Sequence, residues 1–191
     1  MGKIYMIVLA LCSIIISITV VQGIDISPEA VDKWFKKLPH KKEKVTKLHF
    51  FLHEEGTGVN QTAYPVAQSN ISFTSPTLFG LVVMIDDILR VGAASDSQIV
   101  GRCQGLMGLS SLEETSLIMA LTFVFTTGMY NGSSLSFLAR NPTSNKYREM
   151  PIVGGSGVFR LARGIISTQT IVSNATTLHT IAEYELIVFH Y

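Results

Sequence analysis

From Leu48 to the C-terminus, the apolar residues of this chain follow a two-residue repeat, which is the period of a β-strand. Residues 48–54 place leucine and phenylalanine on one face and end that face with Glu54. Residues 180–190 show the same alternation, and no segment after the first 46 residues has the period of an amphipathic helix. A succession of short strands and turns predicts an antiparallel sandwich or barrel.

Nine segments have a strand-like composition. They are residues 48–53, 64–67, 70–73, 78–85, 99–107, 117–127, 135–139, 159–168 and 180–190. They indicate about eight strands, and glycines within them favour a closed, curved barrel. The run 78–85 is apolar throughout, so we expect a strand that is buried on both faces and ends at Asp86 and Asp87.

Glycines and a proline dominate the stretch from Arg148 to Gly164, which predicts a sharp turn that leads into a strand. On that strand Phe159, Leu161 and Arg163 share one face, and a charge on an apolar face needs a partner or a ligand. A phosphate-binding loop is not favoured, because the stretch lacks the Walker lysine and a strand follows it.

The first 23 residues have the composition of a secretory signal peptide. Lys3 precedes a nearly unbroken apolar run, and small Gly23 ends it. An uncleaved membrane anchor is the alternative, which the single lysine and the small residue disfavour. We expect three parts: a signal peptide (1–23), a flexible basic arm with about one helical turn (24–46) and one domain (47–191).

Removal of Lys3 with the leader leaves 14 of the 15 basic residues against 14 acidic ones. This balance argues against a nucleic-acid binder. Cys103 is then the one remaining cysteine, so no intrachain disulfide is expected. The arm carries a cluster of lysines, which either is simply solvated or contacts acidic wall polysaccharide. Four sequons fit a secreted glycoprotein, at Asn60, Asn70, Asn131 and Asn174.

Three carboxylates, Glu54, Asp86 and Asp87, are the candidates for proton transfer. At the mouth of an apolar barrel, burial would raise their pKa values and allow proton exchange with a substrate. Surface turns also collect acids, so an ordinary solvated role is the alternative. His53 beside Glu54 has no second histidine or cysteine pair at ligand spacing, so a metal site is not expected.

An interior Tyr184 would be able to hydrogen-bond a phenolic ligand, although core packing explains an aromatic residue equally well. Phe159 and His53 are further candidates for lining a substrate site. No nucleophile motif and no redox centre is visible, so any oxidative chemistry requires a second protein as the oxidant.

Several motifs together resemble plant dirigent proteins, in the same order and spacing from Lys47 to Tyr191. They are Leu48–His53, Phe79-Gly80, Ile85-Asp86-Asp87, Val100–Gly105, Tyr130–Ser133, Arg140-Asn141-Pro142, Arg148–Gly164 and the ending from Glu183 to Tyr191.

The resemblance implies an eight-stranded antiparallel β-barrel related to allene oxide cyclases, secreted to the apoplast and assembled as a dimer or trimer. Family members bind phenolic radicals, such as those of coniferyl alcohol, that a separate laccase or peroxidase generates, and they impose stereoselective coupling in lignan biosynthesis. Such a role needs no cofactor and no metal. Asp86, Asp87 and Arg163 match the acidic pair and the arginine of the family.

The chain also departs from the lignan-forming members. Glu54 and Val158 stand where those proteins have aspartate, and their disulfide is missing. The Val158–Arg163 segment is similar to the branch that contains pterocarpan synthases, which dehydrate isoflavanols through a quinone methide. Three functions therefore stay open: a guide of radical coupling, a cofactor-free dehydratase or cyclase, and a defence protein that binds wall glycans.

Overall fold

The structure is a computed structural model and describes residues 24–191. The expected signal peptide, residues 1–23, lies outside this range and stays a prediction. Among the described residues, no helix is both long enough and apolar enough to cross a membrane.

Nine strands form one antiparallel sheet. They are β1 (Lys44–Glu55), β2 (Ala63–Ala67), β3 (Val82–Arg90), β4 (Ile99–Leu109), β5 (Ser116–Phe125), β6 (Ser134–Pro142), β7 (Arg148–Ser156), β8 (Arg163–Asn174) and β9 (His179–His190). Their order is β1-β9-β8-β7-β6-β5-β4-β3-β2, and β1 also pairs with β3. The last pairing closes eight strands into a barrel, which confirms the predicted all-β class, and leaves β2 paired with β3 alone.

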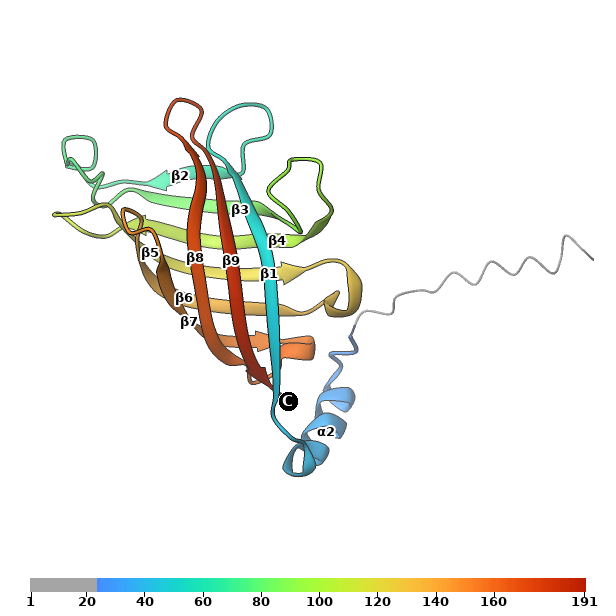
Figure 1. Ribbon diagram of the computed structural model, residues 1–191. Helices are drawn as coiled ribbons and strands as arrows, with labels where there is room; N and C mark the ends of the chain where they lie inside the picture. Colours follow the sequence, from blue (N-terminus) through green and yellow to red (C-terminus); the bar gives the residue numbers. More distant parts are fainter. Residues whose placement is uncertain (1–23) are drawn as a thin grey trace, which may run out of the picture.

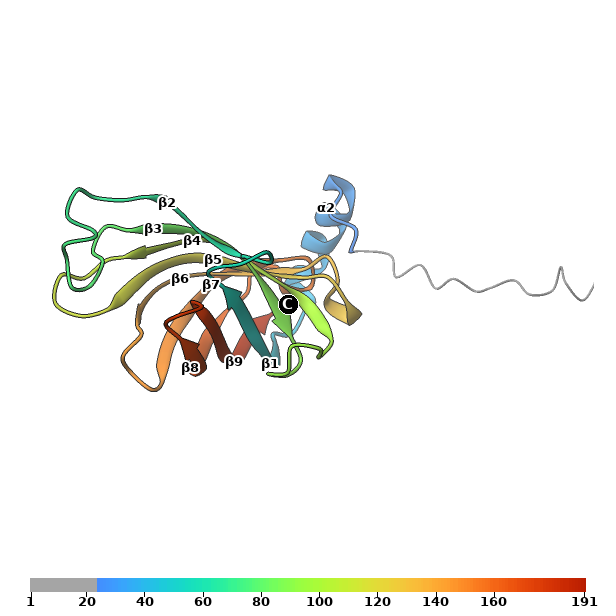
Figure 2. The ribbon, with the colours of Figure 1, turned by 90° about the horizontal axis from the view of Figure 1, so that it is seen from above.

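Figure 1 shows β8, β9 and β1 crossing nearly at right angles to strands β2 to β7. Figure 2 shows the sheet curling so that its two ends meet. The two contacts of β1 differ greatly in extent, with twelve residue pairs to β9 and three to β3. The contact between β1 and β3, called the seam below, is therefore the shorter of the two strand pairings through which β1 closes the barrel.

The glycine-rich stretch differs from the prediction. Residues 148–156 are themselves a strand, β7, whose buried side chains Arg148, Met150 and Ile152 alternate with exposed ones. A single 3₁₀ turn, η3 (Gly157–Phe159), follows, and β8 begins at Arg163. The predicted strand start at Phe159 is wrong, because Gly157 and Leu161 both adopt positive φ angles, 65° and 58°.

Two further strand predictions need correction. Residues 70–73 form a turn and not a strand. Strand β3 continues past the acidic pair to Arg90, and its side chains alternate between exposed and buried from Met84 to Asp87. It is therefore covered on one face only, and Asp86 and Asp87 lie within the strand on opposite faces.

An aromatic cluster fills the barrel. The Phe50 and Tyr184 rings stack with centroids 6.0 Å apart, and the edge of Phe123 meets both at 5.0 and 5.4 Å. Phe137 lies 4.9 Å beyond Phe123. These side chains are almost completely buried, and such ring pairs add packing energy beyond their buried area.

The arm contains a longer helix than expected, α2 (Pro28–Lys37), followed by a 3₁₀ turn, η1 (Leu38–His40). The Ser27 side chain caps it by accepting a hydrogen bond from the Ala30 amide, and Pro28 occupies its first position. Figure 1 shows α2 beyond one end of the barrel, and none of its residues is buried. The Ser27-Pro28 pair is a typical start signal of a helix, which the prediction of about one helical turn did not include.

Candidate functional site

Asp87 is the buried carboxyl group of the barrel interior, with none of its surface exposed. The Thr62 hydroxyl donates a 2.6 Å hydrogen bond to Oδ1 of Asp87, and the Thr62 oxygen accepts one from the Glu55 amide. Oδ2 has no partner among the described residues. Burial, strengthened by the charge of Glu54, raises the pKa of Asp87 to about 8, so this group keeps its proton at neutral pH.

Glu54 adjoins Asp87 across the seam. The β1–β3 pairs end at His53 opposite Ile88, and the next pair in that register places Glu54 opposite Asp87. Glu54 is partly exposed, and burial raises its pKa as well. The two acids therefore form a coupled pair, in which Asp87 is completely buried inside the barrel and Glu54 is partly exposed to solvent.

Two rows of side chains face each other across the interior. On one wall, the register aligns Arg148, Thr168 and Tyr184 across β7, β8 and β9. On the other wall, Asp87 and Cys103 are partners across β3 and β4, and Phe123 follows on β5. The contact between Phe123 and Tyr184 brings the two rows together. Burial raises the pKa of the Tyr184 hydroxyl, which keeps it neutral.

Arg148 is a buried cation, 6% exposed, whose hydrogen bonds all go to neutral acceptors. Its guanidinium donates to Asn141 Oδ1 at 3.0 Å, to the Asn145 carbonyl at 3.2 Å and to Thr170 Oγ1 at 3.0 Å. It forms no ion pair with a described carboxylate. Burial lowers its pKa, and Arg148 and Tyr184 each influence the pKa of the other.

The interior therefore combines a proton donor, a second acid, a neutral phenol and a cation among aromatic rings. This arrangement suits a flat aromatic molecule with oxygen substituents, because the rings offer stacking surface and the polar groups fix its orientation. With its proton on Oδ2, Asp87 is able to donate a hydrogen bond to a ligand while Oδ1 accepts the one from Thr62.

A family model described as dirigent-like protein matches residues 45–189. The chain belongs to the dirigent family. Dirigent protein 23 of Arabidopsis thaliana is 46% identical over 149 residues, which cover 78% of this chain and 80% of the relative. Pterocarpan synthase 1 of Glycyrrhiza echinata is 44% identical over 155 residues, 81% of this chain and 82% of the relative. The solved structure of the pterocarpan synthase dirigent protein GePTS1 superposes with a TM-score of 0.74 at 44% identity, covering 79% of this chain and 87% of that one.

In this dirigent protein, two of the four predicted catalytic residues lie outside the barrel. Asp86 points outward and pairs with Arg102 and Gln104, which lowers its pKa against the opposing effect of burial. Arg163 is exposed, pairs with Glu43 at 3.0 Å and lies 5.0 Å from the Phe189 ring. The prediction that Arg163 shares an apolar face with Phe159 is wrong. The strand β8 begins only at Arg163, and its alternation places Arg163 on the exposed outer face.

The predicted lining residues also separate in space. Tyr184 packs against Phe50 and Phe123, whereas Phe159 packs against Phe125 and Tyr130 in another part of the same core. His53 is buried on the outer side of β1, where its Nε2 lies 3.2 Å from the Gly92 carbonyl, and burial lowers its pKa. Burial raises the pKa of Tyr184, and of the lining candidates Tyr184 is the one whose pKa the charge of Asp87 also influences.

Sequence reasoning missed Arg148 and Thr62. Arg148 begins the glycine-rich stretch, which we interpreted as a turn, so its alternation with Met150 and Ile152 was not recognised as a strand face. Thr62 lies outside any strand, and only the folded chain brings it to Asp87. Among the described residues, the one group of three possible metal ligands is His49, Glu183 and Glu185, on the outer face.

Proposed function

We propose that this dirigent protein binds phenolic radicals inside its barrel and imposes the stereochemistry of their coupling, while a separate laccase or peroxidase generates the radicals. The observation that carries the proposal is Asp87 Oδ2, a buried proton donor with no partner among the described residues. A phenolic or methoxy oxygen of a coniferyl-type substrate would accept its proton. A tenfold preference for one face needs only about 1.4 kcal/mol, roughly the contribution of one such hydrogen bond.

The same acid supports a second candidate, a cofactor-free dehydratase of the pterocarpan synthase type. Asp87 holds its proton at neutral pH, as a general acid must, and Glu54 is the adjoining base. Asp87 would protonate the hydroxyl group that leaves, Glu54 would take the phenolic proton, and the carbon–oxygen bond would break to give water and a quinone methide. A second phenolic oxygen then adds to the methide carbon and returns its proton to Asp87. Glu54 returns its proton to the ring oxygen, which becomes a phenol again, so the net change is loss of one water.

Arg148 replaces Arg163 as the arginine that we assign to the interior. In the dehydration, the oxygen of the substrate ring gains negative charge as its proton leaves, and a buried cation without an anionic partner would stabilise that charge strongly. In radical coupling, the same guanidinium would donate a hydrogen bond to the phenoxyl oxygen. Tyr184 shares a cross-strand row with this cation and contacts Phe123 on the wall that carries Asp87. We assign Asp86 and Arg163 no contact with the substrate, because both face outward.

Chiral chromatography separates the two candidates. Coniferyl alcohol is oxidised by a laccase with and without the protein, and an isoflavanol is incubated with the protein without any oxidant. Enantiomeric excess that depends on the protein supports the guide of radical coupling, and dehydration without oxidant supports the dehydratase. Asp87→Asn is expected to abolish either effect, whereas Asp86→Asn, one residue away on the outer face, is its matched control. Racemic coupling together with no dehydration would contradict both candidates.

We further propose a secreted, N-glycosylated protein of the apoplast. The support is positional: Asn60, Asn70 and Asn131 lie in turns, and Asn174 is exposed at the end of β8. Glycans at these positions would extend from turns and from a strand end, and would leave the outer face of the sheet free. Expression in plant cells, followed by glycopeptide mass spectrometry of the extracellular fluid, tests both points.

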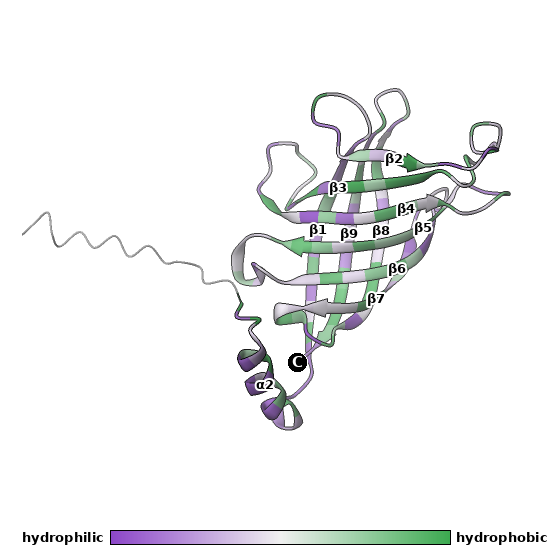
Figure 3. Cartoon of the chain, turned by 180° about the vertical axis from the view of Figure 1, so that it is seen from behind, coloured by the Kyte–Doolittle hydropathy of each residue, from purple (hydrophilic) through white to green (hydrophobic). Residues whose placement is uncertain are grey.

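We also propose that the protein forms a homo-oligomer through the outer face of β2 to β6. Tyr64, Met84, Leu106 and Leu138 belong to one cross-strand row there and are between 39% and 54% exposed. Figure 3 faces these strands and shows hydrophobic segments along them. Light scattering is expected to show an oligomer for the natural chain and a monomer for Leu106→Lys. A monomeric natural chain would contradict this interface.

A further inference from the structure

Two carboxylates and an imidazole converge on the outer face of the barrel, where β1 and β9 pair. His49 and Glu185 are direct partners across the two strands, and Glu183 precedes Glu185 by two residues on the same face. One ligand atom from each residue lies within 4.8 Å of the others. His49 and Glu183 are 134 residues apart in the chain, so no sequence spacing shows this cluster.

The cluster carries negative charge that no lysine or arginine of residues 24–191 neutralises by an ion pair. The one ion-pair partner of Glu183 in this range is the His49 imidazole, at 2.8 Å, and Glu185 has none. Other outer carboxylates, such as Asp86 and Glu43, pair with arginines.

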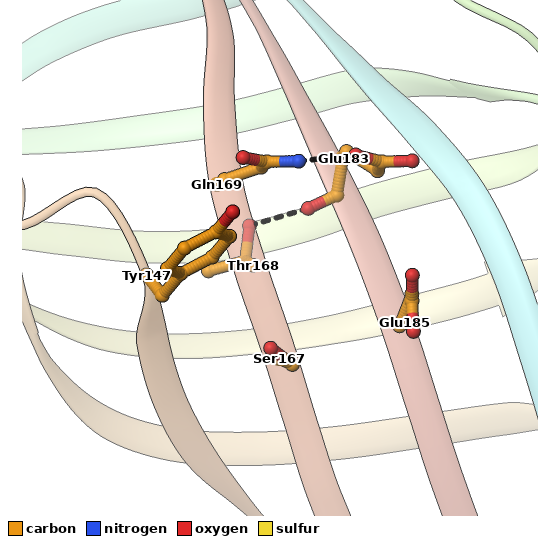
Figure 4. Close-up of a pocket in the computed structure, with 6 residues that line it drawn as sticks. All are labelled: Tyr147, Ser167, Thr168, Gln169, Glu183 and Glu185. Carbon is orange, nitrogen blue, oxygen red and sulfur yellow. Dashed lines mark hydrogen bonds between the residues drawn. The ribbon is translucent and has the colours of Figure 1, made fainter.

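Glu183 is also held in place from the side opposite His49. The Gln169 amide on β8 donates a 2.7 Å hydrogen bond to Oε2, which leaves Oε1 directed toward the imidazole. Figure 4 shows the hydrogen bond between Gln169 and Glu183. Beside it lies a shallow hollow of about 240 Å³, which Tyr147, Ser167, Glu183 and Glu185 help to line. Two of the three cluster residues thus border open space.

We propose that His49, Glu183 and Glu185 bind a divalent transition-metal ion of the Zn²⁺ type on the outside of the barrel. One imidazole nitrogen and two carboxylate oxygens are ligands that Zn²⁺ accepts, at about 2.0–2.2 Å. The imidazole favours Zn²⁺ over Mg²⁺, which prefers oxygen ligands alone. Gln169 orients Glu183 from the second shell. The ion ties β1 to β9 and keeps one coordination position open toward the hollow.

Calorimetric titration of the full mature chain, prepared without a histidine tag, tests the proposal with ZnCl₂. We expect one Zn²⁺ per chain, a rise in Tm with zinc, and no rise with MgCl₂. His49→Ala and Glu183→Gln should each weaken zinc binding by at least about tenfold, and Gln169→Leu by about tenfold. His179→Ala is the matched control, because His179 pairs with Glu55 at 2.8 Å without a third ligand.

Three outcomes would overturn the assignment. They are no zinc binding by the natural chain, unchanged binding by His49→Ala, and an equal loss of binding in His179→Ala. If His49→Ala fails to fold, Glu185→Gln at an exposed position takes its place, and unchanged zinc binding by that variant is equally contradictory.

Discussion

The Thr62 hydroxyl donates a hydrogen bond to one oxygen of the Asp87 carboxyl group and leaves the other oxygen free for a ligand. The bonded oxygen is Oδ1, at 2.6 Å, and Oδ2 has no partner among residues 24–191. A residue between β1 and β2 therefore decides which oxygen of a β3 carboxyl group is available to a ligand.

Thr62→Val removes this hydrogen bond at nearly constant volume. Because the bond lowers the pKa of Asp87 against the effect of burial, we expect that pKa to rise above about 8. The free energy of unfolding should fall by about 1 kcal/mol. Carbon-detected NMR titration of the Asp87 carboxyl group measures the pKa, and denaturant unfolding measures the stability. An unchanged pKa would show that Thr62 does not control this group.

Asp87→Asn is expected to change how stability depends on pH. The pKa of Asp87 is higher in the folded chain, about 8, than its model value of 3.8. The folded state therefore binds more protons between these values, and the stability due to this group falls as pH rises from about 4 to 8. The slope cannot exceed about 1.4 kcal/mol per pH unit. Urea unfolding of both proteins at several pH values should show a flatter curve for Asp87→Asn in this window, and parallel curves would contradict the raised pKa.

Arg148 and the predicted site residue Arg163 should respond differently to the same substitution. Arg148→Gln leaves buried acceptors without donors and is expected to lower the free energy of unfolding by about 2 kcal/mol or more. Arg163→Gln breaks an exposed pair with Glu43 and should cost less than about 1 kcal/mol. Chemical denaturation ranks the two variants. Product stereoselectivity should also fall only in Arg148→Gln, and a larger loss in Arg163→Gln would restore the original assignment.

Gly154 and Gly155 offer a further matched pair. A Cβ atom on Gly155 would lie 2.7 Å from the carbonyl oxygens of Phe159 and Ser134, whereas one on Gly154 would meet nothing within 4 Å. Gly155→Ala is expected to lower stability by about 1–3 kcal/mol. Gly154→Ala should be neutral or stabilise by up to about 1 kcal/mol, since it restricts the unfolded chain. Tm values of the two variants decide this point, and equal values would refute the close approach at Gly155.

The fold was predictable because the two-residue period survives in almost every strand. The period failed where glycines interrupt it: β7 was interpreted as a turn, although Arg148, Met150 and Ile152 alternate correctly. An error of parity had larger consequences for the site. Starting β8 at Phe159 placed Arg163 inside the barrel, and the real start at Arg163 places it outside.

Contacts between distant strands lay beyond the sequence. Nothing along the chain connects Arg148 to Tyr184, which share one cross-strand row, or His49 to Glu185. Strand register decides both, and register depends on closure of the whole barrel. Asp87 was predicted because a carboxylate beside an apolar run is visible within one segment. The sequence did not show which of the two neighbouring aspartates points into the barrel, and Asp86 points outward.

The short seam between β1 and β3 is the weakest part of the barrel closure. Three residue pairs close it, and the acid pair lies immediately beyond the last of them. Local opening there costs far less than separating β1 from β9 and would admit a planar molecule directly to Asp87. If a phenol binds inside the barrel as proposed, binding and closure of the seam are linked equilibria. We then expect the phenol to slow amide hydrogen exchange at residues 88–90, so that exchange at this seam would report on ligand entry.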